Sequence, residues 1–343
     1  MGRRVAIALS GGADSALAAQ VLREAGHEVF ALHAIFTPSA DSAAQADAAH
    51  SVARHLHLEL HTVDLSEQFA HRVIDPFCNA YASGRTPNPC VLCNASIKFG
   101  ALLHVALEQG ADLLATGHYA RVMTDNSGTR LLRARDRRAD QSYFLYRVNA
   151  GTLALTLMPL GDLSRTEVLY RVESRGLPVG RPSKDLCFVN DRTYDGLVAS
   201  RSNPVPGDIV DTTGRVLGRH KGLASYTVGQ RHGLDLALGY PAYVTRLIVD
   251  ENRIVVGPEN ELYSTSATIA DLSWVSGVSP ADCFCAEVQV RYRAKTVRAD
   301  IRVAGSSAQV AFAEPQKAVA PGQSLVVYNG DIVLGGGILQ AKD

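Results

Sequence analysis

The stretch VAIALSGGADSALAAQVLREAG, residues 5–26, decides how the first half of the chain folds. An apolar run ends at Leu9, a Ser-Gly-Gly turn follows, and apolar residues then recur at helical spacing from Asp14 until Gly26. Glycines let the backbone approach an anion closely, and the free N–H groups of a helix N-terminus attract negative charge. The order of strand, glycine turn, hydroxyls and helix therefore predicts a phosphate site in place of an empty turn. The stretch is neither a Walker A loop nor a Gly-x-Gly-x-x-Gly dinucleotide fingerprint.

The remaining pattern divides the chain into an α/β half and a β half. Strand-like runs alternate with helical patterns up to about residue 180, which predicts a parallel sheet with helices on both faces. Beyond residue 204, short β-rich runs are separated by turn signals such as DENR and NGD. We expect an N-terminal Rossmann-like parallel-sheet domain (1–200), a small central linking domain (201–265) and a C-terminal β-barrel (266–343).

Composition limits the class of protein. The 343 residues are too many for one ordinary core, and the 46% hydrophobic and 20% charged fractions are typical of a globular protein. We find neither a signal peptide nor a run of about 18 apolar residues, and therefore expect a cytoplasmic protein that does not enter a membrane. Net charge is zero, so nucleic-acid binding has to rest on local arginine clusters, which lie at residues 130–138 and 291–302. Such clusters are either solvated faces or phosphate-contacting patches.

Six cysteines in a chain of this length, without a secretory signal, favour free thiols over a disulfide framework. Two of them form the C-x-x-C of TPNPCVLCN, residues 86–94. Zinc would need four ligands, and a thioredoxin-like role would need a much smaller redox fold. We expect Cys78, Cys283 and Cys285 to be buried, unreactive thiols. This interpretation fits Cys93 less well, because the prolines and asparagines around it predict an irregular loop, and binding and catalytic residues often lie on loops.

At this point a family resemblance becomes specific. SGGADS resembles the PP-loop signature of ATP pyrophosphatases. Together with GRTPNPCVLCNASIKFG, LLATGHYARV, DQSYFLYRV, SKDLCFV and GRHKGLASYTVGQRHGL it occurs in the order seen in the tRNA-specific 2-thiouridylases of the MnmA family. The resemblance covers essentially the whole chain. It implies ATP-dependent replacement of the C2 oxygen of the wobble uridine (U34) by sulfur in tRNAs for lysine, glutamate and glutamine, with AMP and pyrophosphate as products.

The resemblance also implies how the thiols divide the chemistry. Cys187 would carry a persulfide received from a sulfur-relay protein or a cysteine desulfurase, and Cys93 would attack it and close a transient disulfide that a reductant reopens. Cys90 stands where many relatives have Asp. Cys90, Cys93 and Cys187 could instead hold an iron–sulfur cluster with one open iron, and the sequence leaves this alternative open.

The binding residues that the resemblance implies fall into three groups. ATP, accompanied by Mg²⁺, would contact Ala8, Leu9, Ser10, Gly11, Gly12, Ala13, Asp14, Ser15, Ala34 and Gly117. The flipped target base would contact Asn88, Pro89 and Cys90. The rest of the tRNA would contact His118, Ala139, Asp140, Gln141, Arg291, Tyr292 and Gln323. No dedicated protein cage for a metal is visible, and we expect a monomer or at most a weak dimer.

Three departures from the family pattern bear on these expectations. Ala139 replaces a lysine and removes one tRNA contact, Lys184 replaces a glutamine near Cys187, and the segment FTPSADSAAQ (residues 36–45) is short and lacks the usual aromatic and acidic residues. Two other functions remain open. One is a PP-loop enzyme that adenylates a small carbonyl or carboxylate compound, which would need no paired cysteines. The other is a tRNA-binding or metal-binding module with a degenerate nucleotide loop, which would release no AMP.

Overall fold

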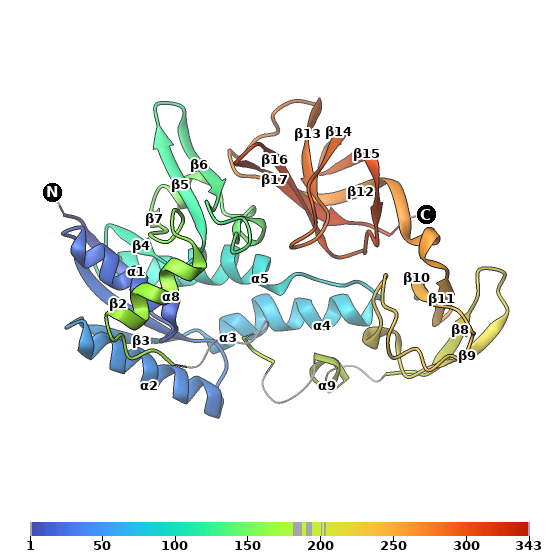
Figure 1. The fold of residues 1–343 in the computed structure, drawn as a ribbon, viewed down its shortest axis with the longest axis horizontal. Coiled ribbons are helices and arrows are strands. Elements are labelled where there is room, and N and C mark those ends of the chain that lie inside the picture. Colours follow the sequence, from blue (N-terminus) through green and yellow to red (C-terminus); the bar gives the residue numbers. More distant parts are fainter. Residues whose placement is uncertain (1, 181–186, 190–193, 200, 202–203, 342–343) are drawn as a thin grey trace.

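The computed structural model describes residues 2–180, 187–189, 194–199, 201 and 204–341. A parallel-sheet unit, a small β unit and a β-barrel follow one another along the chain (Figure 1). This is the predicted fold class. Lys184 lies outside the described residues, so the structure adds nothing on that departure.

The first unit is built on one parallel sheet. Its strands lie in the order β3-β2-β1-β4-β7, with β1 (Arg4–Ala8), β2 (Glu28–Ile35), β3 (Leu60–Asp64), β4 (Leu113–Ala115) and β7 (Thr156–Leu157). The chain moves outward from β1 to β3 and then returns to place β4 on the other side of β1. Such a reversal opens a crevice at the carboxyl ends of the two central strands, and α/β sheets bind ligands there.

Helices cover both faces of this sheet. Val5 and Ile7 face α1 (Ala13–Glu24), α2 (Ala40–His55) and α8 (Arg165–Ser174), whereas Ala6 faces the opposite layer. Because both faces are covered, β1 reads as a continuous apolar run. The other helical segments are α3 (Ser66–Phe69), η1 (Ala70–Ile74), α4 (Asp75–Ala82), α5 (Pro89–Leu92), η2 (Cys93–Leu102), α6 (Leu103–Glu108), η3 (Ser142–Phe144), α7 (Ala150–Leu153) and α9 (Tyr194–Ala199).

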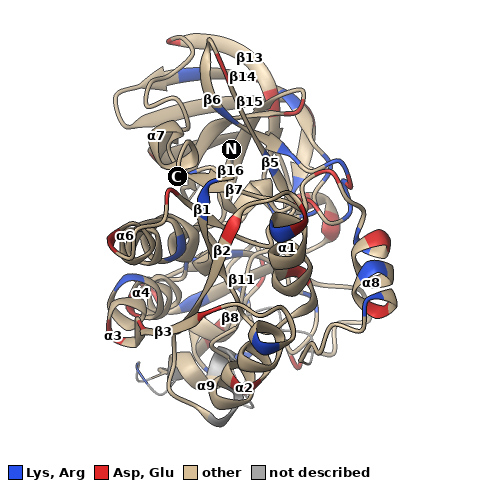
Figure 2. Ribbon diagram, turned by 90° about the vertical axis from the view of Figure 1, so that its left-hand side faces the viewer, with Lys and Arg blue, Asp and Glu red and all other residues tan. Residues whose placement is uncertain are grey.

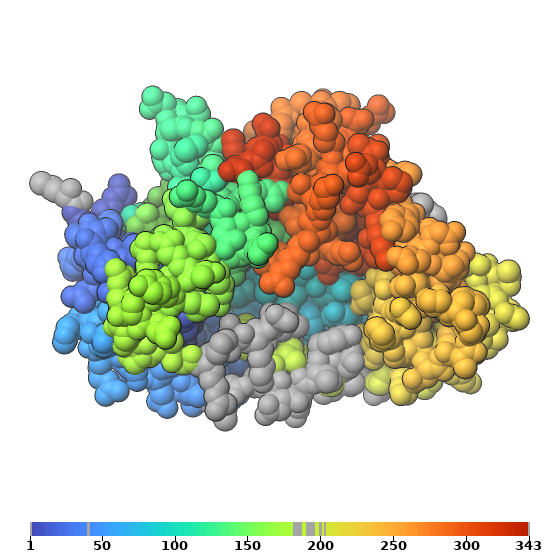
Figure 3. All heavy atoms as spheres, viewed as in Figure 1, coloured from blue at the N-terminus to red at the C-terminus, as the bar shows by residue number. Residues whose placement is uncertain are grey.

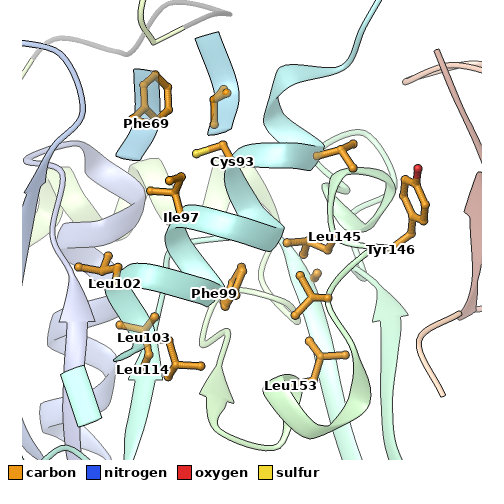
Figure 4. Packing of buried hydrophobic residues seen from close by; sticks show 14 of the residues in the cluster. Phe69, Cys93, Ile97, Phe99, Leu102, Leu103, Leu114, Leu145, Tyr146 and Leu153 are labelled. Carbon is orange, nitrogen blue, oxygen red and sulfur yellow. The ribbon is translucent and has the colours of Figure 1, made fainter. Parts of the chain in front are cut away.

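Segments α5, η2 and α6 form one continuous helix, Pro89–Glu108. This helix is long and apolar enough to cross a membrane by length and composition alone, which corrects our expectation that no segment would be. Its residues Cys93, Ile97, Phe99, Leu102 and Leu103 are buried in the core of the first unit (Figure 4). A buried core helix passes the same test, so the finding is weak support for membrane insertion.

The central unit is a four-stranded sheet with its own small core. Its strand order is β10-β11-β8-β9, from β8 (Gly207–Val210), β9 (Val216–His220), β10 (Tyr243–Ile248) and β11 (Arg253–Gly257). The predicted DENR turn joins β10 to β11. Two short 3₁₀ segments flank these strands, η4 (Leu223–Ser225) and η5 (Glu259–Leu262).

The last unit is a closed barrel, with strands in the order β12-β15-β14-β13-β16-β17 and β17 paired back onto β12. The strands are β12 (Tyr263–Trp274), β13 (Cys283–Gln289), β14 (Val297–Ala304), β15 (Ser307–Lys317), β16 (Ser324–Asn329) and β17 (Ile332–Leu339). The predicted NGD turn joins β16 to β17.

A hairpin of the first unit joins the barrel sheet, which the sequence pattern did not indicate. Its strands are β5 (Ala120–Asp125) and β6 (Gly128–Arg133), and β6 pairs with β17 through Leu131 and Leu132. In the space-filling view the green segment that follows this hairpin lies directly against the orange barrel (Figure 3). Tyr328 of the barrel shares one apolar core with Tyr143 and Tyr146, so the two units are packed against each other.

Candidate active site

The predicted phosphate turn lies between β1 and α1. Gly11 has φ +78°, and a Cβ there would lie 2.7 Å from the Cβ of Ala48, so only glycine fits. The Ser15 hydroxyl donates to the Gly12 carbonyl (3.0 Å) and lies 3.1 Å from the Ser10 hydroxyl. Gly12 caps α1 without any side-chain hydrogen bond, which leaves the helix N-terminus open for an anion.

The neighbouring strands bring two further predicted residues to the same edge of the sheet. Gly117 follows β4, and a Cβ there would lie 2.8 Å from the backbone carbon of Asp14. Ala34 lies near the carboxyl end of β2, half-buried against the core. The turn, Gly117 and Ala34 thus lie together at the carboxyl ends of β1, β2 and β4.

The C-x-x-C lies on a helix, which corrects our expectation of an irregular loop. Asn88 is the N-cap of α5, and Pro89 is its first residue. Proline suits this position because its missing N–H would be unpaired there anyway. Cys90 and Cys93 therefore lie in the first turns of the helix, where the side-chain positions are fixed by the core beneath them.

Cys93 begins the π-helical segment η2, and its thiol is deeply buried, 6% exposed. Burial raises the pKa of the Cys93 thiol to about 12, against the opposing effect of the Lys98 ammonium. Lys98 follows Cys93 by five residues in the same π-helical segment, and its ammonium interacts electrostatically with the Cys93 thiol. No motif in the sequence pointed to Lys98, because a π-helix has no signal that we read from residue type.

Lys98 contacts His118, which directly follows Gly117 in the chain. Its Nζ lies 3.4 Å from His118 Nε2, and His118 Nδ1 lies 2.8 Å from Thr116 Oγ1. Burial lowers the pKa of His118 well below its usual value, and Lys98 acts in the same direction. A neutral His118 can accept from the ammonium through Nε2 only if Nδ1 carries the proton, so this tautomer is fixed by its two partners. The ring of His118 is 8% exposed, so little of it faces solvent.

Cys187 lies near the same group of residues, although about ninety residues separate it from Cys93 in sequence. Its thiol interacts electrostatically with Lys98 and Cys90, and Cys93 interacts with Cys187. Burial of the sulfur atom raises the pKa of the Cys187 thiol, although the residue as a whole is exposed, and the Lys98 ammonium opposes this rise. None of the six cysteines, all of which the structure describes, forms a disulfide, and Cys283 and Cys285 are exposed, which corrects our expectation that both are buried.

Asn88 and Gln323 connect the start of this helix to the barrel. Asn88 Nδ2 donates to Gln323 Oε1 (3.1 Å), and Asn88 Oδ1 accepts from the Ser324 backbone N–H (2.8 Å). Gln323 Nε2 donates to the carbonyl of Thr86 (2.9 Å). These two predicted contacts, one for the base and one for the tRNA, therefore lie in one hydrogen-bonded cluster.

The predicted tRNA segment, residues 139–141, is packed against other parts of the first unit. Asp140 is 8% exposed, and its carboxylate accepts from Ala134 N (2.8 Å) and from the Ser142 hydroxyl (2.9 Å). Burial raises the pKa of Asp140, against these hydrogen bonds. Gln141 Oε1 accepts from the backbone N–H of Tyr119 (2.9 Å). Ala139 packs partly buried against the core.

The two arginine clusters differ in how free their side chains are. Arg133 is 12% exposed at its side chain and lies 3.5 Å over the Tyr328 ring, so it serves the interface with the barrel. Arg130 pairs with Asp125 and Arg137 pairs with Asp331. On the barrel side Arg291 is exposed, whereas the Tyr292 ring packs against the Phe144 ring at a tilt, with ring centroids 4.4 Å apart. Tyr292 therefore brings the barrel loop beside the catalytic unit.

The described side chains do not fit an iron–sulfur cluster. Among the residues that the structure describes, Cys90, Cys93 and Cys187 included, no three His, Cys, Asp or Glu side chains are placed to hold a metal ion. A cluster needs three or four thiolates around it. We therefore derive no step through one.

Three family models match the chain in succession. They are described as the tRNA methyl transferase HUP domain (residues 3–191), the tRNA methyl transferase PRC-barrel domain (196–258) and the aminomethyltransferase beta-barrel domain (264–339). The HUP match covers more than half of the chain and contains the phosphate turn and Gly117. It also contains the thiols of Cys90, Cys93 and Cys187.

Two curated relatives match almost end to end. The tRNA-specific 2-thiouridylase MnmA of Desulforudis audaxviator is 44% identical over 98% of both chains. The MnmA of Acidithiobacillus ferrooxidans is 40% identical over 99% of both. A solved U34-tRNA thiolase, NcsA from Methanococcus maripaludis, has a TM-score of 0.39 and 20% identity over 59% of this chain and 66% of its own, too distant to assign function. By its sequence and its order of domains, the chain belongs to the MnmA family of tRNA-specific 2-thiouridylases.

Proposed function

We propose that this protein uses ATP to replace the C2 oxygen of the wobble uridine of tRNA by sulfur. Family membership supports the reaction class. The observation that supports the proposal is that the Cys93 and Cys187 thiols both interact electrostatically with Lys98, whose ammonium lies 3.4 Å from the ring of His118, the residue after Gly117. A small-molecule adenylating enzyme would have no use for the two thiols.

In the first step the turn binds ATP. The open N-terminus of α1 and the backbone of residues 8–15 would hold its phosphates, Gly117 leaves room beside the turn, and Ala34 lies toward the nucleotide. Mg²⁺ would accompany the phosphates as part of the substrate. The C2 oxygen of uridine attacks the α-phosphorus, the bond to the β-phosphate breaks, and pyrophosphate leaves. The base is then linked through oxygen to AMP, which is a good leaving group.

In the second step sulfur replaces that oxygen. Cys187, the exposed thiol, accepts a terminal sulfur from a persulfide donor, either a relay protein or a cysteine desulfurase. The Cys93 thiolate attacks Cys187 Sγ, the S–S bond of the persulfide breaks, and hydrosulfide is released. Hydrosulfide adds at C2, and AMP departs with the former C2 oxygen. The Cys93–Cys187 disulfide then needs two electrons from a dithiol reductant.

The base and the tRNA would meet residues that already form one cluster. Asn88, Pro89 and Cys90 lie at the start of the helix, next to Gln323 of the barrel. His118, residues 139–141 and the loop bearing Arg291 and Tyr292 would extend this contact surface. Because Ala139 is apolar, we expect the segment to contribute through its backbone and Gln141. The three units would divide at 1–200, 201–265 and 266–343, and the chain would act as a monomer in the cytoplasm.

Nucleoside mass spectrometry tests the proposal. Unmodified tRNA for lysine or glutamate is incubated anaerobically with the protein, Mg-ATP and a persulfide source. The proposal expects 2-thiouridine at the wobble position only with ATP, its loss in Cys187→Ser, and its retention in the matched control Cys283→Ser, which removes an exposed barrel thiol. AMP without thiouridine would mean that another substrate is adenylated, and absence of both would overturn the proposal.

A further inference from the structure

Asp14 of the phosphate turn is held by two side chains from distant parts of the first unit. The Tyr119 hydroxyl donates to Asp14 Oδ1 (2.7 Å), and Arg165 Nη1 donates to Asp14 Oδ2 (2.7 Å). Burial raises the pKa of Tyr119, so its hydroxyl stays a donor at neutral pH. Neither Tyr119 nor Arg165 belongs to the binding residues that the family resemblance implies.

The same two residues also hold the segment expected to contact tRNA. Tyr119 donates its backbone N–H to Gln141 Oε1 (2.9 Å) and accepts from the Gln141 backbone N–H (2.8 Å). Arg165 donates its backbone N–H to Asp136 Oδ2 (3.0 Å). Asp136 in turn accepts from the backbone N–H groups of Arg138 (3.0 Å) and Ala139 (3.1 Å). Tyr119 thus touches the nucleotide turn with its side chain and the tRNA segment with its backbone, whereas Arg165 reaches Ala139 of that segment through Asp136.

Tyr119 and Arg165 differ in exposure. Tyr119 is 1% exposed and fixed by the core, whereas the Arg165 side chain is 47% exposed at the start of α8. Basic and acidic positions occur together along this helix (Figure 2). ATP phosphates in the turn would repel the Asp14 carboxylate and attract the Arg165 guanidinium beside it. The Arg165 side chain is therefore the part that can exchange Asp14 for phosphate while its backbone still holds Asp136.

We propose that Tyr119 and Arg165 are positioning residues that couple ATP binding to tRNA binding, an inference that rests on the proposed function. ATP fixes the Arg165 side chain and thereby orders residues 136–141. Bound tRNA fixes residues 136–141 and thereby keeps Arg165 aimed at the turn. Each ligand finds the shared residues already ordered by the other, which gives positive cooperativity. The coupling is reciprocal, so each ligand raises the affinity for the other by the same factor.

The test measures tRNA affinity with and without α,β-methylene-ATP, which cannot be cleaved between its α- and β-phosphates. In the wild type we expect this analogue to tighten tRNA binding about tenfold, within the usual range of allosteric coupling. Arg165→Gln should reduce the factor to about twofold or less, and Arg165→Lys should restore part of it. Tyr119→Phe, which removes only the hydroxyl, should lower the factor without abolishing it.

The chain provides a matched control in Arg175. It follows α8 and pairs with Glu24 of α1 at 3.2 Å, so Arg175→Gln removes an ion pair between the same two helices without touching Asp14. The control should keep the tenfold factor. The inference would be overturned if the analogue tightened tRNA binding by the same factor in the wild type and in Arg165→Gln. It would also be overturned if Arg165→Gln and Arg175→Gln lowered this factor equally, or if a wild type that thiolates tRNA showed no coupling. Absence of thiolation in the wild type would instead overturn the proposed function.

Discussion

The buried thiol of Cys93 should be nearly unreactive in the free protein. Its pKa of about 12 compares with 9.0 for an ordinary thiol. At pH 7.5 about 3 in 100,000 Cys93 side chains would then be thiolate, against about 3 in 100 for an ordinary thiol, a ratio of about a thousand. Alkylation requires the thiolate, so iodoacetamide should label Cys93 about a thousand times more slowly than an exposed thiol.

The assay follows labelling by peptide mass spectrometry between pH 7.5 and 11. The exposed residues Cys283 and Cys285 serve as references within the same molecule. Cys93 shares a tryptic peptide with Cys90, so fragment spectra must separate the two sites. A raised pKa predicts that the Cys93 rate rises about tenfold per pH unit beyond pH 9. A rate that levels off near pH 9 would mean that shielding alone protects the thiol. Labelling within tenfold of the references at pH 7.5 would refute the reasoning outright.

Three further predictions concern single substitutions. Lys98→Met removes the ammonium that opposes the raised pKa of the Cys187 thiol, so the pH profile of Cys187 alkylation should move to higher pH. Lys98→Arg keeps the charge and should keep the profile. An unchanged profile in Lys98→Met would contradict the effect of Lys98 on Cys187. Gly117→Ala places a Cβ 2.8 Å from the backbone of Asp14 and so displaces the phosphate turn, and the KM for ATP should rise on the order of a hundredfold. Asn88→Ala leaves a barrel N–H without its acceptor, which should lower the free energy of unfolding by about 1–3 kcal/mol in denaturant titrations.

These predictions share a physical basis, which is how far each group is shielded from solvent. A buried thiol is held neutral, a glycine at a close approach cannot accept a methyl group, and a buried N–H cannot turn to solvent when its acceptor is removed. Exposed groups such as Cys283 lack these constraints, which is why they serve as controls.

The sequence by itself determined the fold class and the nucleotide turn, because both depend on local patterns. The apolar run of β1, the two glycines and the helical repeat of α1 lie within one continuous stretch, and its spacing fixes its conformation. The hairpins of the β half were likewise readable from their turn residues. The family motifs pointed to Cys93 and Cys187 as partners, although no local pattern links them.

Only the tertiary structure decided how distant residues act together. The C-x-x-C lies at the start of a helix that is π-helical from Cys93 onward, and the Lys98 ammonium of that segment interacts with the Cys93 thiol. The link from Asp14 through Tyr119 and Arg165 to the tRNA segment joins residues up to about 150 positions apart. Such contacts depend on how packed elements meet, and sequence spacing carries no direct record of that.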